Sequence, residues 1–198
     1  DKLHTTAESH HRVMLLEVMG RYTGWIALQA GIAGGADVIV IPEIPYDIKK
    51  IITAIKKRRS SGKSFSIIVV AEGAKPLGGD YTIQRVVEGS PDPQRLGGVS
   101  HRLAHEIEEL TTLETRVTIL GHLQRGGSPT AFDRLLASRY GTAAVQCLLD
   151  GKFGCMTALH GSEIVSVPLA MAIGELKTVP IEGDLVQTAK NLGISFGK

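Results

Sequence analysis

Basic side chains and glycines stand together at residues 122–129, where the sequence is HLQRGGSP. His122 and Arg125 are candidate donors to a phosphate, and the glycine pair at 126–127 would let the backbone approach a ligand closely because it carries no Cβ atoms. A helix predicted from Thr130 would add oriented N–H groups and partial positive charge at its start. The segment predicts an anion-binding turn, although an ordinary strand-to-helix loop would also explain it.

Two further ionisable residues follow predicted strands. Arg21 comes after Gly20 in the sequence EVMGR at residues 17–21, and Glu72 directly follows the apolar run at residues 64–71. A carboxylate at the end of a strand can accept two sugar hydroxyls, whereas either residue could also be a solvated loop charge. The carboxyl ends of parallel strands converge on one crevice. The three strand ends together predict a binding site for an anionic small molecule that bears hydroxyl groups.

The elements that would position these residues alternate along most of the chain. Strands are predicted at residues 12–18, 37–41, 64–71 and 114–120, and helices at residues 22–33, 46–59, 94–110 and 130–149. The strand at 64–71 is apolar nearly throughout, as expected for a strand covered on both faces. The alternation predicts an α/β fold with a mainly parallel sheet. Weaker patterns predict short strands at 156–159 and 163–167 and a helix at 184–192.

Two segments depart from this alternation. Residues 73–98 are polar and rich in Gly, Pro and Asp, which predicts a surface insertion. The first nine residues look like the last turns of a helix, and no initiator Met precedes them. We therefore expect that an upstream portion is missing and that residues 1–198 are incomplete as a functional unit.

Composition excludes several classes of function. Twenty-two basic and twenty acidic residues give a net charge of +2, which is too balanced to indicate a nucleic-acid partner. No apolar run approaches the roughly 20 residues that a membrane-spanning helix needs. The two cysteines, Cys147 and Cys155, are too few for a disulfide framework and favour a reducing cytoplasm.

Metal-binding and phosphate-donor motifs are not evident. His101 and His105 are four residues apart on a predicted helix, but no glutamate follows His101 as in a zincin motif, so surface histidines are expected and no metal is assigned to this chain. The sequence has no Gly-x4-Gly-Lys-Ser/Thr loop and no nucleophile elbow. The chain alone therefore lacks the machinery that would hold a phosphoryl donor.

Several blocks, taken in order, resemble one known family. The sequences EVMGRYTG at 17–24, AGGA at 33–36, Glu72 and GHLQRGGSP at 121–129 closely resemble the C-terminal half of the bacterial-type 6-phosphofructokinases. The resemblance runs over nearly the whole chain. It implies a three-layer, phosphofructokinase-like fold in which residues 1–198 form the fructose 6-phosphate-binding half and the donor-binding N-terminal half is absent.

The resemblance implies roles for several residues in binding the sugar phosphate. Glu72 would hold sugar hydroxyls, and Met19 and Gly20 would line the sugar. His122 and Arg125 would grip the 6-phosphate. Each of these roles fits the chemistry of the side chain that would perform it.

Three arginines complete the implied site. Arg12 and Arg116 would reach the 6-phosphate from a neighbouring subunit, so the resemblance implies a homo-oligomer, a tetramer or a dimer. Arg21 would bind and stabilise the transferring phosphoryl group as the catalytic residue. Phosphoryl-transfer enzymes work mainly by positioning and charge neutralisation, which suits an arginine.

The implied reaction is glycolytic transfer of a phosphoryl group to the 1-hydroxyl of fructose 6-phosphate. ATP or pyrophosphate, with Mg²⁺, would be the donor and would be bound mainly by the absent N-terminal half. The chain would then be inactive alone, and the enzyme would be cytoplasmic, with no nucleic-acid or membrane partner. The alternative is a non-catalytic sugar-phosphate-binding or regulatory subunit of the same fold.

Overall fold

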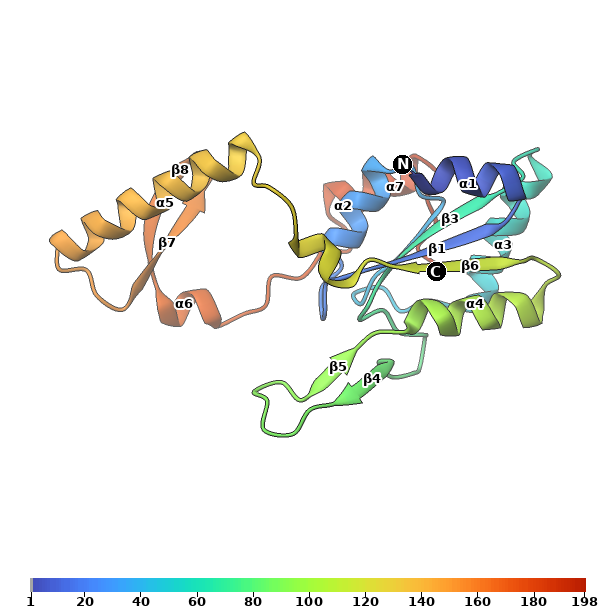
Figure 1. The fold of residues 1–198 in the computed structure, drawn as a ribbon, viewed down its shortest axis with the longest axis horizontal. Coiled ribbons are helices and arrows are strands. Elements are labelled where there is room, and N and C mark those ends of the chain that lie inside the picture. Colours follow the sequence, from blue (N-terminus) through green and yellow to red (C-terminus); the bar gives the residue numbers. More distant parts are fainter. Residues whose placement is uncertain (1) are drawn as a thin grey trace. The chain divides into compact units, whose positions relative to one another are not determined.

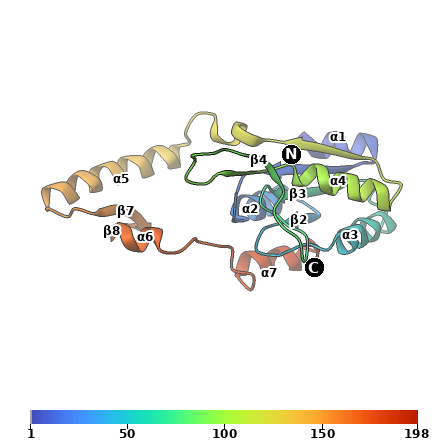
Figure 2. The ribbon, with the colours of Figure 1, turned by 90° about the horizontal axis from the view of Figure 1, so that it is seen from below.

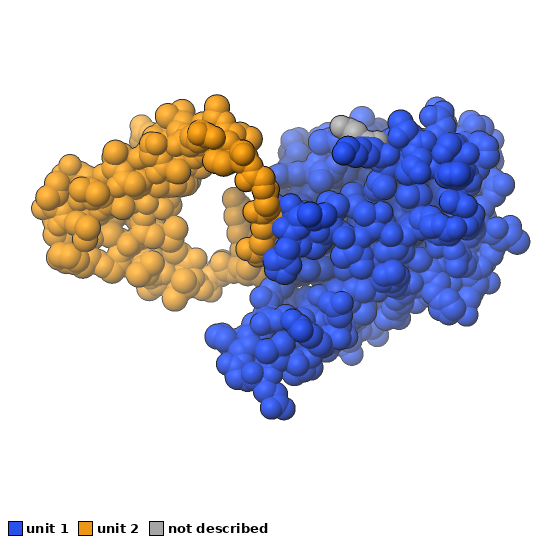
Figure 3. All heavy atoms as spheres, in the orientation of Figure 1, with its two compact units in different colours: residues 1–124, 178–198 blue, residues 125–177 orange. Residues whose placement is uncertain are grey.

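The computed structural model describes residues 2–198, which divide into two compact units (Figure 3). Unit 1 contains the residues up to 124 together with 178–198, and unit 2 contains residues 125–177.

Unit 1 is built on a four-stranded parallel sheet. Its strands are β1 (Val13–Val18), β2 (Val38–Val40), β3 (Ser66–Ala71) and β6 (Thr115–Ile119), in the order β2-β3-β1-β6. Val13 of the central strand β1 stands opposite Ser66 on one side and Thr115 on the other. All four strands thus run in one direction and have their carboxyl ends at the same edge of the sheet.

Helices cover both faces of this sheet (Figures 1 and 2). The helices are α1 (Lys2–His10), α2 (Trp25–Ala33), α3 (Ile48–Ser60), α4 (Val99–Leu110) and α7 (Asp184–Asn191). One core cluster joins α2 and α7 to one face, and a second joins α3 and α4 to the other. The predicted α/β fold, a three-layer sandwich with a mainly parallel sheet, is confirmed in unit 1.

The end of the chain returns to unit 1 and completes the sheet edge. Ser195 accepts a hydrogen bond from the N–H of Ile39 at 2.8 Å and donates its own N–H to Asp37 at 3.0 Å. Val38 of β2 and Ser195 form an isolated parallel bridge. The backbone groups on the outer side of β2 are therefore paired, as buried backbone requires.

The predicted helix at 94–110 is wrong at its start. The helix α4 begins at Val99, and residues 94–96 instead form strand β5 (Gln94–Leu96), which pairs antiparallel with β4 (Ile83–Val86). Gly98, the residue before α4, has φ +82° and so cannot continue a right-handed helix from residues 94–97. The predicted insertion at 73–98 contains this β4–β5 hairpin.

Unit 2 consists of a long helix, a hairpin and a short helix. These are α5 (Ala131–Leu149), β7 (Cys155–His160), β8 (Glu163–Pro168) and α6 (Leu169–Ile173), and β7 and β8 pair antiparallel. None of residues 125–177 is buried. Large apolar side chains such as Phe132, Leu148 and Phe153 are exposed. Among the helices of residues 2–198, none is both long and apolar enough to cross a bilayer.

Candidate functional site

The turn after β1 and the residue after β3 meet at the carboxyl edge of the sheet. Glu72 follows β3 directly, and its N–H donates to the carbonyl oxygen of Val18, the last residue of β1, at 2.9 Å. Oε1 of Glu72 accepts the N–H of Arg21 at 3.0 Å and the N–H of Gly20 at 3.4 Å. Two of the three strand ends that the sequence singled out are thus in direct contact.

This contact imposes strict local geometry. A Cβ atom at Gly73 would lie 1.6 Å from the carbonyl oxygen of Arg21, so only glycine fits there. Arg21 has φ +50°, a left-handed backbone conformation that residues other than glycine rarely adopt. Such a conformation persists where the surroundings enforce it, and here the Glu72 carboxylate holds the Arg21 N–H. Gly73 was not among the site residues predicted from the sequence.

The third strand end reaches the same turn through Gln124. After β6 the chain enters a short 3-10 helix, η1 (Gly121–Arg125). The N–H of Leu120 donates to the carbonyl oxygen of Glu17 at 3.2 Å, and Oε1 of Gln124 accepts the N–H of Met19 at 2.7 Å. Sequence reasoning missed Gln124, although it lies inside the HLQRGG block, because an uncharged amide gave no chemical signal.

A buried carboxylate fixes β1 to the start of α4. Glu17 is only 3% exposed. It accepts hydrogen bonds from the N–H of Gly98 at 2.9 Å, the N–H of Ser100 at 3.0 Å and the hydroxyl of Ser100 at 2.5 Å. These donors at a helix N-terminus compensate for removing the charge from water. The sequence indicated this buried carboxylate only through a single acidic residue inside the apolar run MLLEV.

The side chain of Arg21 extends towards the β4–β5 hairpin. Its Nη2 forms an ion pair with Asp92 and donates to the carbonyl oxygen of Gln94 at 3.5 Å. The guanidinium also lies 5.6 Å from the ring centroid of Tyr22, whose hydroxyl donates to the Asp92 carboxylate at 3.2 Å. Asp92 was not among the sequence-predicted site residues because it is distant in sequence from the motifs.

Arg12 and Arg116 lie at the other end of the strands. Arg12 precedes β1 and pairs with Glu114 at 2.6 Å, and Arg116 pairs with the other oxygen of Glu114. The hydrogen bond from Arg12 is the main reason that the pKa of Glu114 is lowered. Arg12 is seven residues before Met19, so the intervening strand separates them by about 23 Å. One chain does not bring these arginines to the turn that holds Arg21 and Glu72.

His122 is exposed on η1, and Arg125 is the first residue of unit 2. The unit boundary falls between Gln124 and Arg125, so a contact of Arg125 with the strand-end site stays a prediction.

The predicted turn does lie between a strand and a helix, β6 and α5, and its first part is the 3-10 helix η1. Helix α5 begins at Ala131 with a capping box in which Thr130 and Asp133 hydrogen-bond each other. The backbone and hydroxyl hydrogen bonds from Thr130 lower the pKa of Asp133. A carboxylate already occupies the helix start that was expected to attract a phosphate.

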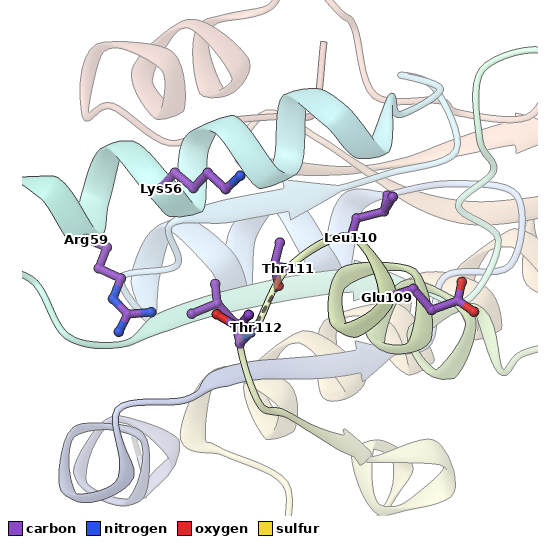
Figure 4. A pocket seen from close by; sticks show the side chains of 7 residues that line it. Lys56, Arg59, Glu109, Leu110, Thr111 and Thr112 are labelled. Carbon is purple, nitrogen blue, oxygen red and sulfur yellow. Dashed lines mark hydrogen bonds between the residues drawn. The ribbon is translucent and has the colours of Figure 1, made fainter.

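One cavity of unit 1 lies away from this edge. A cavity of about 460 Å³ is lined by residues at the ends of α3 and α4, including Lys56, Arg59 and Glu109 (Figure 4). Both helix ends lead into the starts of strands, so the cavity is at the opposite edge of the sheet. None of the predicted site residues lines it.

Most of the chain matches a known protein family. The family model described as phosphofructokinase matches residues 1–148, about three quarters of the chain. The chain belongs to the phosphofructokinase family. The match covers all of the strand-end residues described above.

Individual phosphofructokinases extend the match to the whole chain. An ATP-dependent 6-phosphofructokinase 2 of Clostridium perfringens is 55% identical over 99% of this chain and 54% of its own length. A pyrophosphate–fructose 6-phosphate 1-phosphotransferase of Amycolatopsis mediterranei is 51% identical over 92% of this chain and 53% of its length. The solved phosphofructokinase structure of Saccharomyces cerevisiae matches with a TM-score of 0.73 and 32% identity, over 100% of this chain and 24% of that one.

This phosphofructokinase chain spans about half the length of the curated relatives it matches. Within residues 2–198, no group of three or more His, Cys, Asp or Glu side chains is arranged to hold a metal ion. The described residues at this sheet edge form a turn with backbone N–H groups, a carboxylate and a guanidinium.

Proposed function

We propose that this chain is the fructose 6-phosphate-binding half of a 6-phosphofructokinase. The complete enzyme would transfer a phosphoryl group from ATP or pyrophosphate to the 1-hydroxyl of fructose 6-phosphate, giving fructose 1,6-bisphosphate in glycolysis. The observation that carries the proposal is the meeting of Glu72 and the Met19–Arg21 turn, in a chain of the phosphofructokinase family. The names of its relatives support the same reaction.

Glu72 is suited to hold the sugar. Its Oε1 accepts the two N–H groups of the turn, and no described residue donates to its Oε2. An ionised carboxylate oxygen is an acceptor only, so Oε2 can take a hydroxyl of the sugar ring. Met19 and Gly20 would line the sugar beside it.

Arg21 is suited to stabilise the phosphoryl group during transfer. Charge in that transition state is spread over the equatorial oxygens, and a fixed cation beside them lowers the barrier without covalent chemistry. Among the residues described, the hydrogen bond, ion pair and ring contact of the guanidinium are to the hairpin and to Tyr22, and the hairpin is bound through Nη2. The N–H groups on Nε and Nη1 would face the phosphoryl oxygens.

The 6-phosphate would be held by residues from two subunits. His122 and Arg125 would bind it from the chain that holds the sugar, and Arg12 and Arg116 from a neighbour. The placement of Arg12 one strand length from Met19 supports this division, because the two ends cannot serve one ligand within a chain. A composite site of this kind requires a homo-oligomer, which we propose to be a tetramer or a dimer.

The phosphoryl donor would be bound elsewhere. ATP or pyrophosphate with Mg²⁺ would be bound mainly by the half that the longer relatives possess beyond this match, and the isolated chain would be inactive. Transfer of this kind belongs to the cytoplasm, where the unpaired Cys147 and Cys155 would remain reduced.

The test is phosphoryl transfer by the complete protein, at the length of its curated relatives. Purified protein is given fructose 6-phosphate with either Mg-ATP or Mg-pyrophosphate, and fructose 1,6-bisphosphate is measured. Activity with one donor is expected, and Glu72→Gln should raise the KM for fructose 6-phosphate more than it lowers kcat. Inactivity with both donors, alongside retained binding of fructose 6-phosphate, would instead indicate the non-catalytic subunit.

A further inference from the structure

Hairpin β4–β5 reaches the turn that carries Arg21, although the sequence marks it only as a polar insertion. Nη2 of Arg21 is shared between two acceptors of the hairpin, the Asp92 carboxylate and the carbonyl oxygen of Gln94. We propose that Asp92 is a positioning residue that fixes the Arg21 guanidinium for phosphoryl transfer. This inference rests on the proposed function of Arg21.

The pattern of donors on Arg21 suits positioning. A guanidinium has five N–H donors in a planar fork. Nη2 donates a hydrogen bond to Gln94 and forms an ion pair with Asp92, whereas no described residue accepts a hydrogen bond from Nε or Nη1. Holding one corner of the plane sets the direction of the remaining three donors. The Tyr22 ring, 5.6 Å from the guanidinium carbon, supports the plane from a second side.

Asp92 is itself fixed by hydrogen bonds from the hairpin and from the turn, so it can hold the Arg21 side chain in one orientation. From the hairpin, its carbonyl oxygen accepts Nη1 of Arg95 at 3.0 Å and the hydroxyl of Ser90 at 3.0 Å. From the turn, the hydroxyl of Tyr22 donates to both carboxylate oxygens, at 3.2 and 3.3 Å. The Arg21 and Asp92 side chains are 42% and 34% exposed, so both could reorient in solvent if these hydrogen bonds were lost.

The base of the insertion is attached to the same turn. Tyr22 packs edge to face against Tyr81, with ring centroids 5.6 Å apart. Nζ of Lys75 lies 5.0 Å from the centroid of the Tyr81 ring. The hairpin is therefore connected to the Arg21 turn through the Tyr22 ring as well as through the Asp92 carboxylate.

The Asp92 carboxylate also partly neutralises the positive charge of Arg21. Two models of the role of Asp92 therefore predict opposite effects on activity when Asp92 is removed. If Asp92 acted as a latch that sequesters Arg21, removing it would raise activity. If Asp92 positions Arg21, removing it lowers turnover and has little effect on sugar binding, because Arg21 acts on the transferring group. The second outcome is the one we expect, since only one nitrogen of the fork is engaged.

The kinetic experiment uses the complete protein. Asp92→Ala is expected to lower kcat about tenfold and to change the KM for fructose 6-phosphate less than threefold. Asp92→Asn retains an acceptor oxygen for Nη2 and should stay within about threefold of the unmodified kcat. Glu88→Ala is the matched control, because Glu88 is an exposed carboxylate on the same hairpin with no contact to the turn. An unchanged or raised kcat for Asp92→Ala overturns the proposal.

A double-mutant cycle separates positioning from a general structural effect. If Asp92 acts only through Arg21, the double variant Arg21→Ala/Asp92→Ala should be as active as Arg21→Ala alone. Losses that multiply in the double variant would show that Asp92 matters for another reason and would overturn the proposal.

A chemical measurement keeps the test independent of activity. Phenylglyoxal modifies accessible arginines, and its rate at Arg21 can be followed by mass spectrometry of the peptide. The rate is expected to rise at least about threefold in Asp92→Ala and to stay constant in Glu88→Ala. An unchanged rate in Asp92→Ala refutes the contact even in an inactive protein. A raised rate in a protein without phosphoryl transfer would leave the contact standing and refute the proposed function.

Discussion

The two units of this chain use apolar residues in opposite ways. Unit 1 buries them on both faces of a parallel sheet, as in the contact of Leu15 and Ile68 with α3 and α4. Unit 2 exposes them, and its 19-residue helix α5 has no buried residue. A helix with apolar residues on most of its surface is ordinarily a buried helix. The strand-end site therefore has a core of its own beneath it, whereas the segment carrying Arg125 does not.

The largest difference in unfolding free energy between the two units is expected when one methyl group is added to each. Gly73→Ala places a Cβ atom 1.6 Å from the carbonyl oxygen of Arg21 and should destabilise unit 1 by about 4 kcal/mol or displace the turn. Gly141→Ala, in the middle of α5, meets no atom within 4 Å and should stabilise that helix by about 0.5 to 1 kcal/mol. Denaturant unfolding of both variants checks the opposite signs.

Removal of one leucine side chain should distinguish the two units nearly as strongly. Leu15 is fully buried in β1, and Leu15→Ala should cost about 3 kcal/mol of unfolding free energy. Leu148 in α5 is 62% exposed, and Leu148→Ala should change the stability of this 198-residue chain by less than about 0.5 kcal/mol. Similar losses in calorimetry would mean that α5 is buried in solution.

In the complete protein, substitution of Arg21 should mainly change kcat, and substitution of Arg125 should mainly change the KM for the sugar phosphate. Arg21→Ala is expected to lower kcat about 100-fold, because the lost contact forms to the transferring group. Arg125→Ala should chiefly raise the KM for fructose 6-phosphate, by about tenfold, because the 6-phosphate is not consumed. Steady-state kinetics measure both. An unchanged sugar affinity in Arg125→Ala would remove Arg125 from the site.

The smallest effects concern two carboxylates with lowered pKa values. In unit 1 the Thr115 hydroxyl, and then its N–H, hold the pKa of Glu108 below the usual 4.5. The stability from this contact is complete above pH 4.5 and is lost as the pH falls through the lower folded pKa. Thr115→Val removes the hydroxyl donor and should raise the pKa of Glu108 part of the way to 4.5.

In unit 2 the corresponding donor is Thr130, whose N–H and hydroxyl lower the pKa of Asp133 within one helix turn. Thr130→Val should raise that pKa only part of the way, because the N–H remains. Carboxyl NMR titration measures both variants, and an unchanged pKa for Glu108 in Thr115→Val would contradict the hydrogen bond between Thr115 and Glu108.

Local pattern predicted most of the elements of both units. The alternation of apolar runs located β1, β3 and α5 within a few residues, because side-chain periodicity follows from backbone geometry. It missed β4, which is exposed throughout, and β5, in which only Leu96 is buried, because such short strands show no alternating apolar face. The pattern also could not show that α5 is exposed in this chain. An apolar composition indicates that a helix needs to be covered, but it does not show whether the covering residues are present in this chain.

The sequence by itself determined the alternating strands and helices of the parallel sheet, the charged residues at the strand ends and the family resemblance, because these depend on neighbouring residues and short motifs. Only the tertiary structure decided which groups meet them. Gln124 reaches Met19 across 105 positions, and Asp92 reaches Tyr22 across 70. Such contacts have no local signal, because they arise when the packing of α4 and β6 against β1 brings distant backbone together. The same packing makes Gly73 obligatory and leaves Arg12 a strand length away from the turn.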